Sequence, residues 1–143
     1  MTDNLNEADR KKTMKAVKSK NTFPERRLRA SLAGNGINGW KLHNQEVPGK
    51  PDISFLGEKI AIFVDGCFWH GCPTCAKPLP KTNKEYWSRK IKRNCERDKE
   101  LDLILHDEGW LILRVWTHEI RKMDSLRVIT SRINCMVINR RST

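Results

Sequence analysis

The chain has 143 residues, the length of one ordinary domain, and it carries 28 Lys and Arg against 17 Asp and Glu. Its mean hydropathy of −0.67 and the lack of an apolar run of about eighteen residues exclude a membrane-spanning helix. The first residues lack the apolar segment of a secretory signal, so we expect a cytosolic protein with no membrane partner. The net charge of +11 favours a polyanionic partner, with nucleic acid foremost.

The N-terminal half predicts two helices followed by three strands. Residues 7–20 are typical of a basic helix with Met14 on its apolar side. Thr22 and Glu25 form a capping box, which predicts a second helix that begins there and ends at Gly34. A tight turn at residues 57–58 joins the last two of the expected strands, which cover residues 40–44, 52–56 and 59–64.

The C-terminal half predicts helix, strand and helix. Thr82 and Glu85 form a second capping box, which opens a long helix to about residue 106. Residues 110–116 are mostly apolar, as in a strand that is buried on both faces. Asp124 is expected to cap a last helix whose apolar face carries Leu126, Ile129, Ile133 and Val137. The order predicts an α/β domain over residues 21–143, with a mixed sheet flanked by helices.

Five cysteines suggest a metal site rather than a disulfide framework, because their number is odd and no export signal precedes them. Cys67, Cys72 and Cys75 lie within nine residues, and short spacers of this kind suit the tetrahedral geometry of zinc. His118 is the best candidate for the fourth ligand, and His70 is its competitor. Four protein ligands would make a closed, structural site. The two remaining cysteines, Cys95 and Cys135, are expected to be small buried apolar residues.

Asp52 and His70 point to metal-dependent hydrolysis. Asp52 stands at the start of one strand of the predicted hairpin, from which it can reach the end of the next strand. A carboxylate is the hard oxygen ligand that Mg²⁺ prefers. His70 lies a few residues beyond that second strand and could act as the general base on the attacking water. Together with the cysteines, the pair predicts a metal-dependent nuclease.

Three stretches resemble the very short patch repair (Vsr) endonucleases. They read GKPDI followed by IFVDGCFWHGCP, then KTNKEYW with the basic run KIKRNCERD, and finally GW with LRVW and HE. The N-terminal RKKTMKAVKSKNT also fits the pattern of that family. The resemblance covers about residues 10–119. It implies a restriction-endonuclease-like fold, related to the PD-(D/E)xK nucleases, and an enzyme that nicks one DNA strand 5′ to the T of a T:G mismatch left by deaminated 5-methylcytosine.

The resemblance also implies roles for individual residues. Asp52 and the main-chain carbonyl of Val64 would bind Mg²⁺, His70 would activate the water, and Glu25 and Asp98 would hold metal-bound waters. The zinc ligands would be Cys67, Cys72, Cys75 and His118. The groups that would wedge into the base stack are Phe68, Trp69, Trp87 and Met14. The chain departs from the wider superfamily because residues 60–64 contain neither the second acid nor the lysine. Asp65 is kept as a reserve ligand.

Simpler interpretations accompany these roles. Glu25 has a local explanation as the last residue of a capping box, Asp98 could pair with a neighbouring cation, and aromatic side chains are mostly core. Residues 1–20 are expected to contact DNA, and Lys90 and Asn94 lie on a plausible phosphate-contact face of the long helix. Two other functions stay open, a restriction-type nuclease acting on matched DNA and a non-enzymatic zinc DNA-binding module. We expect a monomer in the cytoplasm, associated with the nucleoid of a prokaryote, and mismatch-repair proteins are candidate partners.

Overall fold

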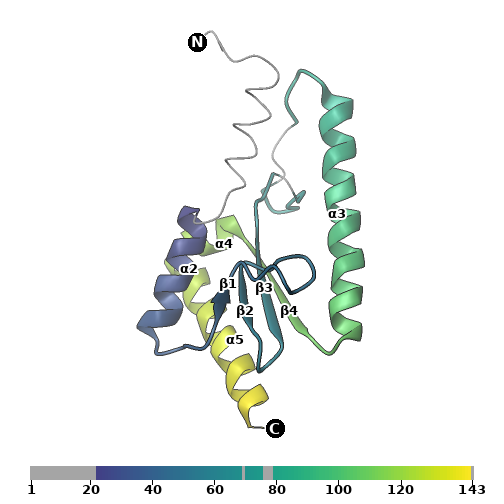
Figure 1. Ribbon diagram of the computed structural model, residues 1–143. Coiled ribbons are helices and arrows are strands. Elements are labelled where there is room, and N and C mark those ends of the chain that lie inside the picture. Colours follow the sequence, from purple (N-terminus) through teal and green to yellow (C-terminus); the bar gives the residue numbers. More distant parts are fainter. Residues whose placement is uncertain (1–21, 69, 76–78, 143) are drawn as a thin grey trace.

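A computed structural model describes residues 22–68, 70–75 and 79–142 of the chain. In this part of the chain, helices lie on both faces of one four-stranded sheet (Figure 1). The expected basic helix over residues 7–20, with Met14, and the expected wedge residue Trp69 lie outside the described residues. Among the residues described, none of the helices combines the length and the apolar character that crossing a lipid bilayer requires.

The sheet is mixed, as predicted, and its strands follow chain order from β1 to β4. The strands β1 (Lys41–Leu42), β2 (Ile53–Phe55) and β3 (Ile60–Asp65) are antiparallel neighbours. The strand β4 (Leu111–Trp116) lies parallel to β3, with Arg114 opposite Phe63. A parallel pair needs a long crossover, and the chain supplies one because the longest helix stands between β3 and β4 in sequence.

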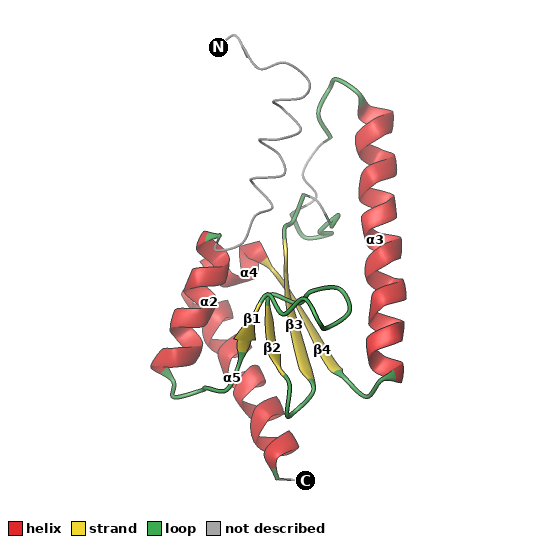
Figure 2. Cartoon of the chain, viewed as in Figure 1, coloured by secondary structure: helices red, strands yellow, loops and turns green. Residues whose placement is uncertain are grey.

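Helices α2 (Phe23–Gly34), α4 (Thr117–Arg121) and α5 (Met123–Arg141) cover one face of the sheet, and α3 (Lys84–Asp107) covers the other (Figure 2). Side chains alternate along β3, so that Ile60 and Ile62 pack toward α2 and α5, whereas Ala61 and Phe63 pack toward α3. The predicted apolar face of the last helix is confirmed, since all four of its members are buried: Leu126, Ile129, Ile133 and Val137.

The three predicted helix starts are corrected in detail. Thr22 does occupy the N-cap of α2, but its side chain makes no capping hydrogen bond. The N-cap of α3 is Asn83, in the left-handed conformation, and not Thr82. Lys122 precedes α5, and Asp124 lies in its first turn. The short helix α4 was not predicted. Capping motifs describe local hydrogen bonding only, whereas residues in the first turns of α2 and α3 also contact distant residues, Glu25 with His43 and Trp87 with Phe68.

Two burial predictions were also wrong. The strand β4 is an edge strand, and only Leu113 and Val115 along it are buried. Its other face carries the polar side chain of Arg114, so the strand is not apolar on both sides. Cys95 is half-buried and Cys135 is exposed, so neither is the buried apolar residue that the sequence analysis predicted. The alternation of β4 matters below, because Arg114 faces α3.

Candidate active site and cysteine cluster

The candidate site lies at the carboxyl end of β3. A cavity of about 550 Å³ opens there, between the first turn of α2, the loop that precedes β2, and the middle of α3. Eight of the predicted site residues line it: Glu25, Asp52, Val64, Cys67, Phe68, His70, Asn94 and Asp98. In mixed α/β sheets, the ends of neighbouring strands are where side chains from distant segments converge. The cavity therefore collects residues that are far apart in the sequence.

One side of the cavity holds the Asp52 cluster, which consists of Glu25, His43 and Asp52. The Val64 main-chain N–H donates to Asp52 Oδ2 over 2.6 Å, so Asp52 does reach the end of the neighbouring strand. His43 lies between the two acids, with Nε2 at 3.3 Å from Glu25 Oε2 and Nδ1 at 3.8 Å from Asp52 Oδ1. The ligand atoms of the three residues are close enough together to hold a metal ion.

Burial raises the pKa of Asp52 from 3.8 to about 7. The hydrogen bond from Val64 lowers this pKa, but the charge of Glu25 raises it further. A carboxylate in such a place is costly to ionise by itself, and a bound cation would stabilise its charged form. Glu25 is 8% exposed despite its position in the first turn of a helix. Its side chain faces His43, a residue outside its own helix.

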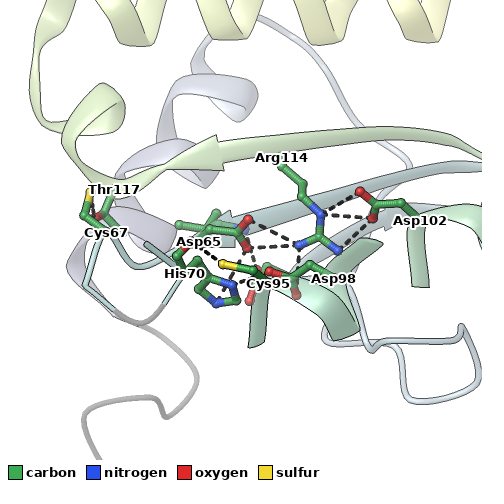
Figure 3. A network of polar contacts seen from close by, with 10 residues as sticks. Asp65, Cys67, His70, Cys95, Asp98, Asp102, Arg114 and Thr117 are labelled. Carbon is green, nitrogen blue, oxygen red and sulfur yellow. Dashed lines mark hydrogen bonds and ion pairs between the residues drawn. The ribbon is translucent and has the colours of Figure 1, made fainter. Parts of the chain in front are cut away.

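The other side of the cavity holds the His70 cluster, which consists of Asp65, His70 and Asp98 (Figure 3). His70 Nδ1 lies 2.5 Å from Asp98 Oδ2, and its Nε2 lies 3.9 Å from Asp65 Oδ1. The Cys95 thiol donates to the main-chain carbonyl of His70 over 3.2 Å. The imidazole is therefore held at its backbone and at one ring nitrogen, in an arrangement that suits a general base.

Arg114 joins this cluster to α3. Its Nε and Nη2 donate to Asp102 at 2.9 and 2.8 Å, and its Nη1 lies 3.2 Å from both carboxylate oxygens of Asp65. Burial raises the pKa of Asp65, although His70 and Arg114 partly offset this rise. Asp65 lies on the sheet face opposite Val64, as strand alternation predicts, and its partner is Arg114.

The cysteine cluster consists of Cys67, Cys72, Cys75 and His118. The three sulfur atoms lie 3.3, 3.5 and 3.4 Å from His118 Nδ1. Ligands on a tetrahedral zinc ion with bonds of about 2.0–2.3 Å are roughly 3.5 Å apart, so the donor set fits such an ion, and the cluster could hold a metal. His118 comes from α4, which ties the loop after β3 to the end of β4.

The thiols of this cluster differ in acidity. Burial opposes ionisation of Cys67, but hydrogen bonds with Thr117 and His118 outweigh it and lower its pKa to about 6. Desolvation and the neighbouring Cys67 and Cys72 sulfurs raise the pKa of Cys75 to about 11. The surroundings of Cys67 therefore favour its thiolate, whereas a metal ion would be needed to stabilise several thiolates side by side.

A basic surface continues from the cavity along α3. A second hollow of about 490 Å³ is lined there by Tyr86, Arg89, Lys90, Arg93, Asn94 and Arg97. Phe68 and Trp87 meet edge to face, with ring centroids 5.8 Å apart, and Lys90 Nζ lies 6.0 Å from the centroid of the Trp87 ring. The two predicted wedge residues in the described part of the chain are thus in contact, beside the cavity and the basic surface.

Sequence reasoning missed two residues of this site. His43 carried no argument, although the expected strand at residues 40–44 places it opposite Asp52 in an antiparallel pair, where its N–H donates to the Asp52 carbonyl over 3.1 Å. Arg114 was quoted only within the LRVW stretch. A single arginine in an otherwise apolar strand was the available signal, since a buried charge needs a partner.

Comparison with known proteins then identifies the family. The sequence model of the family described as DNA mismatch endonuclease Vsr matches residues 2–77. The chain belongs to this family. It is 40% identical over 126 residues to the type II nicking enzyme V.XorIIP of Xanthomonas oryzae pv. oryzae, a match that covers 88% of the chain and 92% of the relative.

Two further relatives support the assignment. The type II nicking enzyme V.NaeI of Lentzea aerocolonigenes is 43% identical over 116 residues, which cover 78% of the chain and 69% of that protein. The DNA mismatch endonuclease Vsr of Escherichia coli is 34% identical over 126 residues, which cover 88% of the chain and 80% of that protein. As a member of the Vsr family, the chain is a DNA endonuclease. The resemblance to the Vsr endonucleases found in the sequence is thereby confirmed.

Proposed function

We propose that this Vsr-family endonuclease has a restriction-endonuclease-like fold and nicks one strand of double-stranded DNA, 5′ to the T of a T:G mismatch produced by deamination of 5-methylcytosine. The nick would start very short patch repair. The observation that carries the proposal is the cavity at the end of β3. It brings an oxygen-rich cluster around Asp52 within reach of a histidine, His70, that is paired to a carboxylate.

Magnesium suits the Asp52 cluster. Asp52 and the main-chain carbonyl of Val64 would hold the ion, and Glu25 and Asp98 would hold its waters. The donor set consists mainly of oxygens, the kind of ligand that Mg²⁺ prefers, and a cation would relieve the cost of ionising the buried Asp52. When bound, Mg²⁺ would supply positive charge to the scissile phosphate and the departing 3′-oxygen. His43 lies against both acids, with ring nitrogens 3.3 Å from Glu25 and 3.8 Å from Asp52, and would help to orient them.

His70 would act as the general base. An ionised Asp98 accepts a hydrogen bond, so the Nδ1 of His70 would carry the ring proton, and Nε2 would be left to accept a proton from the attacking water. Asp98 thereby sets both the tautomer and the orientation of the ring. Hydrolysis with water attacking in line with the 3′-oxygen would leave a 3′-hydroxyl and a 5′-phosphate.

Zinc is proposed for the cysteine cluster, as a structural ion. Its three sulfurs and one imidazole are the donors of a closed zinc site. His118 is favoured as the fourth ligand over His70 because His118 Nδ1 lies within 3.5 Å of all three sulfurs, whereas His70 is paired to Asp98. His70 is thus left for chemistry, and the zinc would hold the loop that carries it.

DNA recognition is proposed for the aromatic and basic residues near the cavity. Phe68 and Trp87 would insert beside the mismatch, together with Trp69 and Met14, because inserted apolar groups unstack a base step for a few kcal/mol. A T:G wobble pair is cheaper to distort than a matched pair, so insertion favours it. Lys90 and Asn94 would contact the backbone, and residues 1–20 would add a basic DNA-contacting helix.

The remaining proposals concern assembly and place. We expect a monomer, since a mismatch is an asymmetric lesion that one protein can read. We also expect the protein to work in the cytoplasm, on the nucleoid of a prokaryote, with mismatch-repair proteins as candidate partners. The charge of +11 supports association with DNA.

A strand-resolved nicking assay tests the proposal. Duplexes labelled on each strand would carry one T:G pair in varied sequence contexts, with matched T:A and C:G duplexes as controls, in Mg²⁺ or in EDTA. The expected result is a Mg²⁺-dependent nick on the T strand alone. Cleavage of both strands in matched DNA would indicate a restriction-type nuclease instead. Salt-sensitive binding without cleavage in any context would favour the zinc DNA-binding module.

A further inference from the structure

Arg114 lies among three carboxylates. Neither the sequence patterns nor the family assignment gives this arginine a role. Its guanidinium carbon lies 4.3 Å from the centroid of the Phe63 ring, which supports it from the sheet. Three acids surround its nitrogens, Asp65 from β3 and Asp98 and Asp102 from α3. A planar guanidinium can donate in several fixed directions at once, which a lysine cannot do.

The arrangement closes on His70. Arg114 Nη1 lies 3.2 Å from Asp65 and 3.6 Å from Asp98 Oδ1, while the other oxygen of Asp98 bonds to His70 Nδ1. The second ring nitrogen of His70 points back toward Asp65. Arg114, Asp98, His70 and Asp65 thus form a ring of contacts in which the only fixed positive charge is the guanidinium (Figure 3).

Without that charge, the ring would not hold its shape. Three carboxylates would then face one another within the span of one side chain, and like charges so close repel. Asp98 comes from α3 and Asp65 from β3, so repulsion would turn Asp98 away from the sheet. The imidazole would lose the acceptor that fixes its tautomer, because no other carboxylate lies within hydrogen-bond distance of its ring nitrogens in the described residues.

We propose that Arg114 is a positioning residue, which holds Asp98 against Nδ1 of His70 and pairs with both oxygens of Asp65 near Nε2, and so keeps the imidazole in the Nδ1–H tautomer. The inference deepens the proposed function, on which the role of His70 as base rests. It assigns to Arg114 no contact with DNA or with a metal. Its effect on nicking passes through Asp98.

A simpler role must be separated from this one. The two bonds from Nε and Nη2 to Asp102 would by themselves pin α3 to β4, and no hydrogen bond or ion pair joins Asp102 to His70. If Arg114 only pinned the helix, loss of Asp102 would do the same damage as loss of Arg114. Asp102→Asn is therefore the matched control for Arg114→Gln, with Arg114→Lys as the variant that keeps the charge but not the fork.

Two readouts decide between the roles. The first is the ¹⁵N spectrum of labelled histidines at about pH 8.5, where neutral imidazole predominates and the tautomer can be read directly; His70→Asn assigns the signal. The second is the single-turnover nicking rate at saturating T:G duplex, measured beside the dissociation constant for DNA. We expect Arg114→Gln to mix the tautomers of His70 and to slow nicking ten- to hundred-fold, with the dissociation constant changed less than two-fold.

The controls complete the test. Asp102→Asn should keep the parent tautomer and a rate within three-fold, and Arg114→Lys should fall between Arg114→Gln and the parent. Adding Arg114→Gln to Asp98→Asn should slow nicking no further than Asp98→Asn alone, since both act through one contact. Should Arg114→Gln not fold, Arg114→Lys gives the same comparison with Asp102→Asn.

An unchanged His70 tautomer in the Arg114 variants would overturn the proposal, as would equal losses in Arg114→Gln and Asp102→Asn. Failure of the proposed function would look different, because the parent would then nick none of the duplexes or would cut both strands of matched DNA. The spectra would still report in that case whether Arg114 fixes the ring.

Discussion

The Asp52 cluster and the cysteine cluster can both hold a metal, yet they differ in donors and in access. The Asp52 cluster offers two carboxylates and one imidazole from three separate segments, and it opens onto a cavity of about 550 Å³. The cysteine cluster offers three sulfurs from one short loop, and two of them, on Cys67 and Cys72, are 6% and 3% exposed. A metal ion in an open site made mainly of oxygens can also bind water and phosphate. A metal ion in a closed site with four protein ligands has a structural role.

The two clusters lie close together in the chain, with Asp52 and Cys67 separated by a single hairpin. Position along the chain therefore does not distinguish the candidate catalytic metal site from the candidate structural one. What distinguishes the two clusters is the type of their donor atoms and their exposure. The comparison predicts that damage to the Asp52 cluster abolishes activity without unfolding the protein, and that damage to the cysteine cluster unfolds it.

The largest expected effect is on nicking by Asp52→Ala. The rate should fall by about 10³-fold or more, because a metal contributes several kcal/mol to stabilising the charge that develops at the phosphate. Binding of T:G duplex should stay close to that of the parent, and the variant should remain folded. Single-turnover kinetics measure nicking, and gel shifts measure binding. Asp124→Asn, at an exposed residue, is the control. Nicking at the parent rate by Asp52→Ala in Mg²⁺ would remove the metal assignment.

The next effect is on stability, from Cys72→Ser. A structural zinc contributes about 10–16 kcal/mol of binding free energy that is coupled to folding, so losing one ligand should lower the free energy of unfolding by at least about 3 kcal/mol. Thermal melts and the zinc content of the purified protein measure this. Cys135→Ser is the matched control because that thiol is exposed and lies outside the cluster. A melting curve for Cys72→Ser that overlays the parent's would contradict a structural metal.

A third prediction concerns pH and sharpens the account of Asp52. Its pKa of about 7 in the fold lies above the ordinary value of 3.8. Between these values the folded chain holds a proton that the unfolded chain has lost, so the free energy of unfolding falls as pH rises from about 4 to about 7. Asp52→Asn should remove this fall in the free energy of unfolding. The fall amounts to at most about 4 kcal/mol, because each unit of pKa difference corresponds to about 1.4 kcal/mol.

Urea melts at several pH values, without added Mg²⁺, test the prediction. The variant should be more stable than the parent at pH 8 and nearly equal to it at pH 4. Asp65 also has a raised pKa and is present in both proteins, so the difference between them isolates Asp52. Parallel pH curves for parent and variant would show that burial of Asp52 carries no such cost. Added Mg²⁺ should restore the stability of the parent at pH 8, since it favours the ionised form.

The smallest of the four effects is on recognition, through Trp87→Ala. Loss of one stacking ring should weaken binding to T:G duplex by about 1–3 kcal/mol and binding to matched duplex by less, because only the mismatch is cheap to unstack. Lys90→Ala gives the contrast on the same helix. It should weaken both duplexes alike and reduce the salt slope of binding by about one. Equal loss on both duplexes in Trp87→Ala would argue against a wedge.

Much of this protein followed from local patterns. The spacing of Cys67, Cys72 and Cys75 predicted a metal-holding loop, and the apolar period of the last helix predicted its buried face. The hairpin placed Asp52 within reach of Val64, because strand pairing fixes which residues stand opposite one another. These features depend on residues near in sequence, whose geometry the helix and strand periods set by themselves.

Tertiary structure alone decided the rest. Glu25, interpreted from the sequence as part of a capping box, contacts His43 because α2 packs on the sheet. The strand β4 is an edge strand with a polar side chain on one face. Its Arg114 pairs with Asp65 on the neighbouring strand β3 and, because α3 packs on that face, with Asp102. No local period encodes such contacts. They depend on which elements meet, and a buried charge selects its partner only after the elements have met.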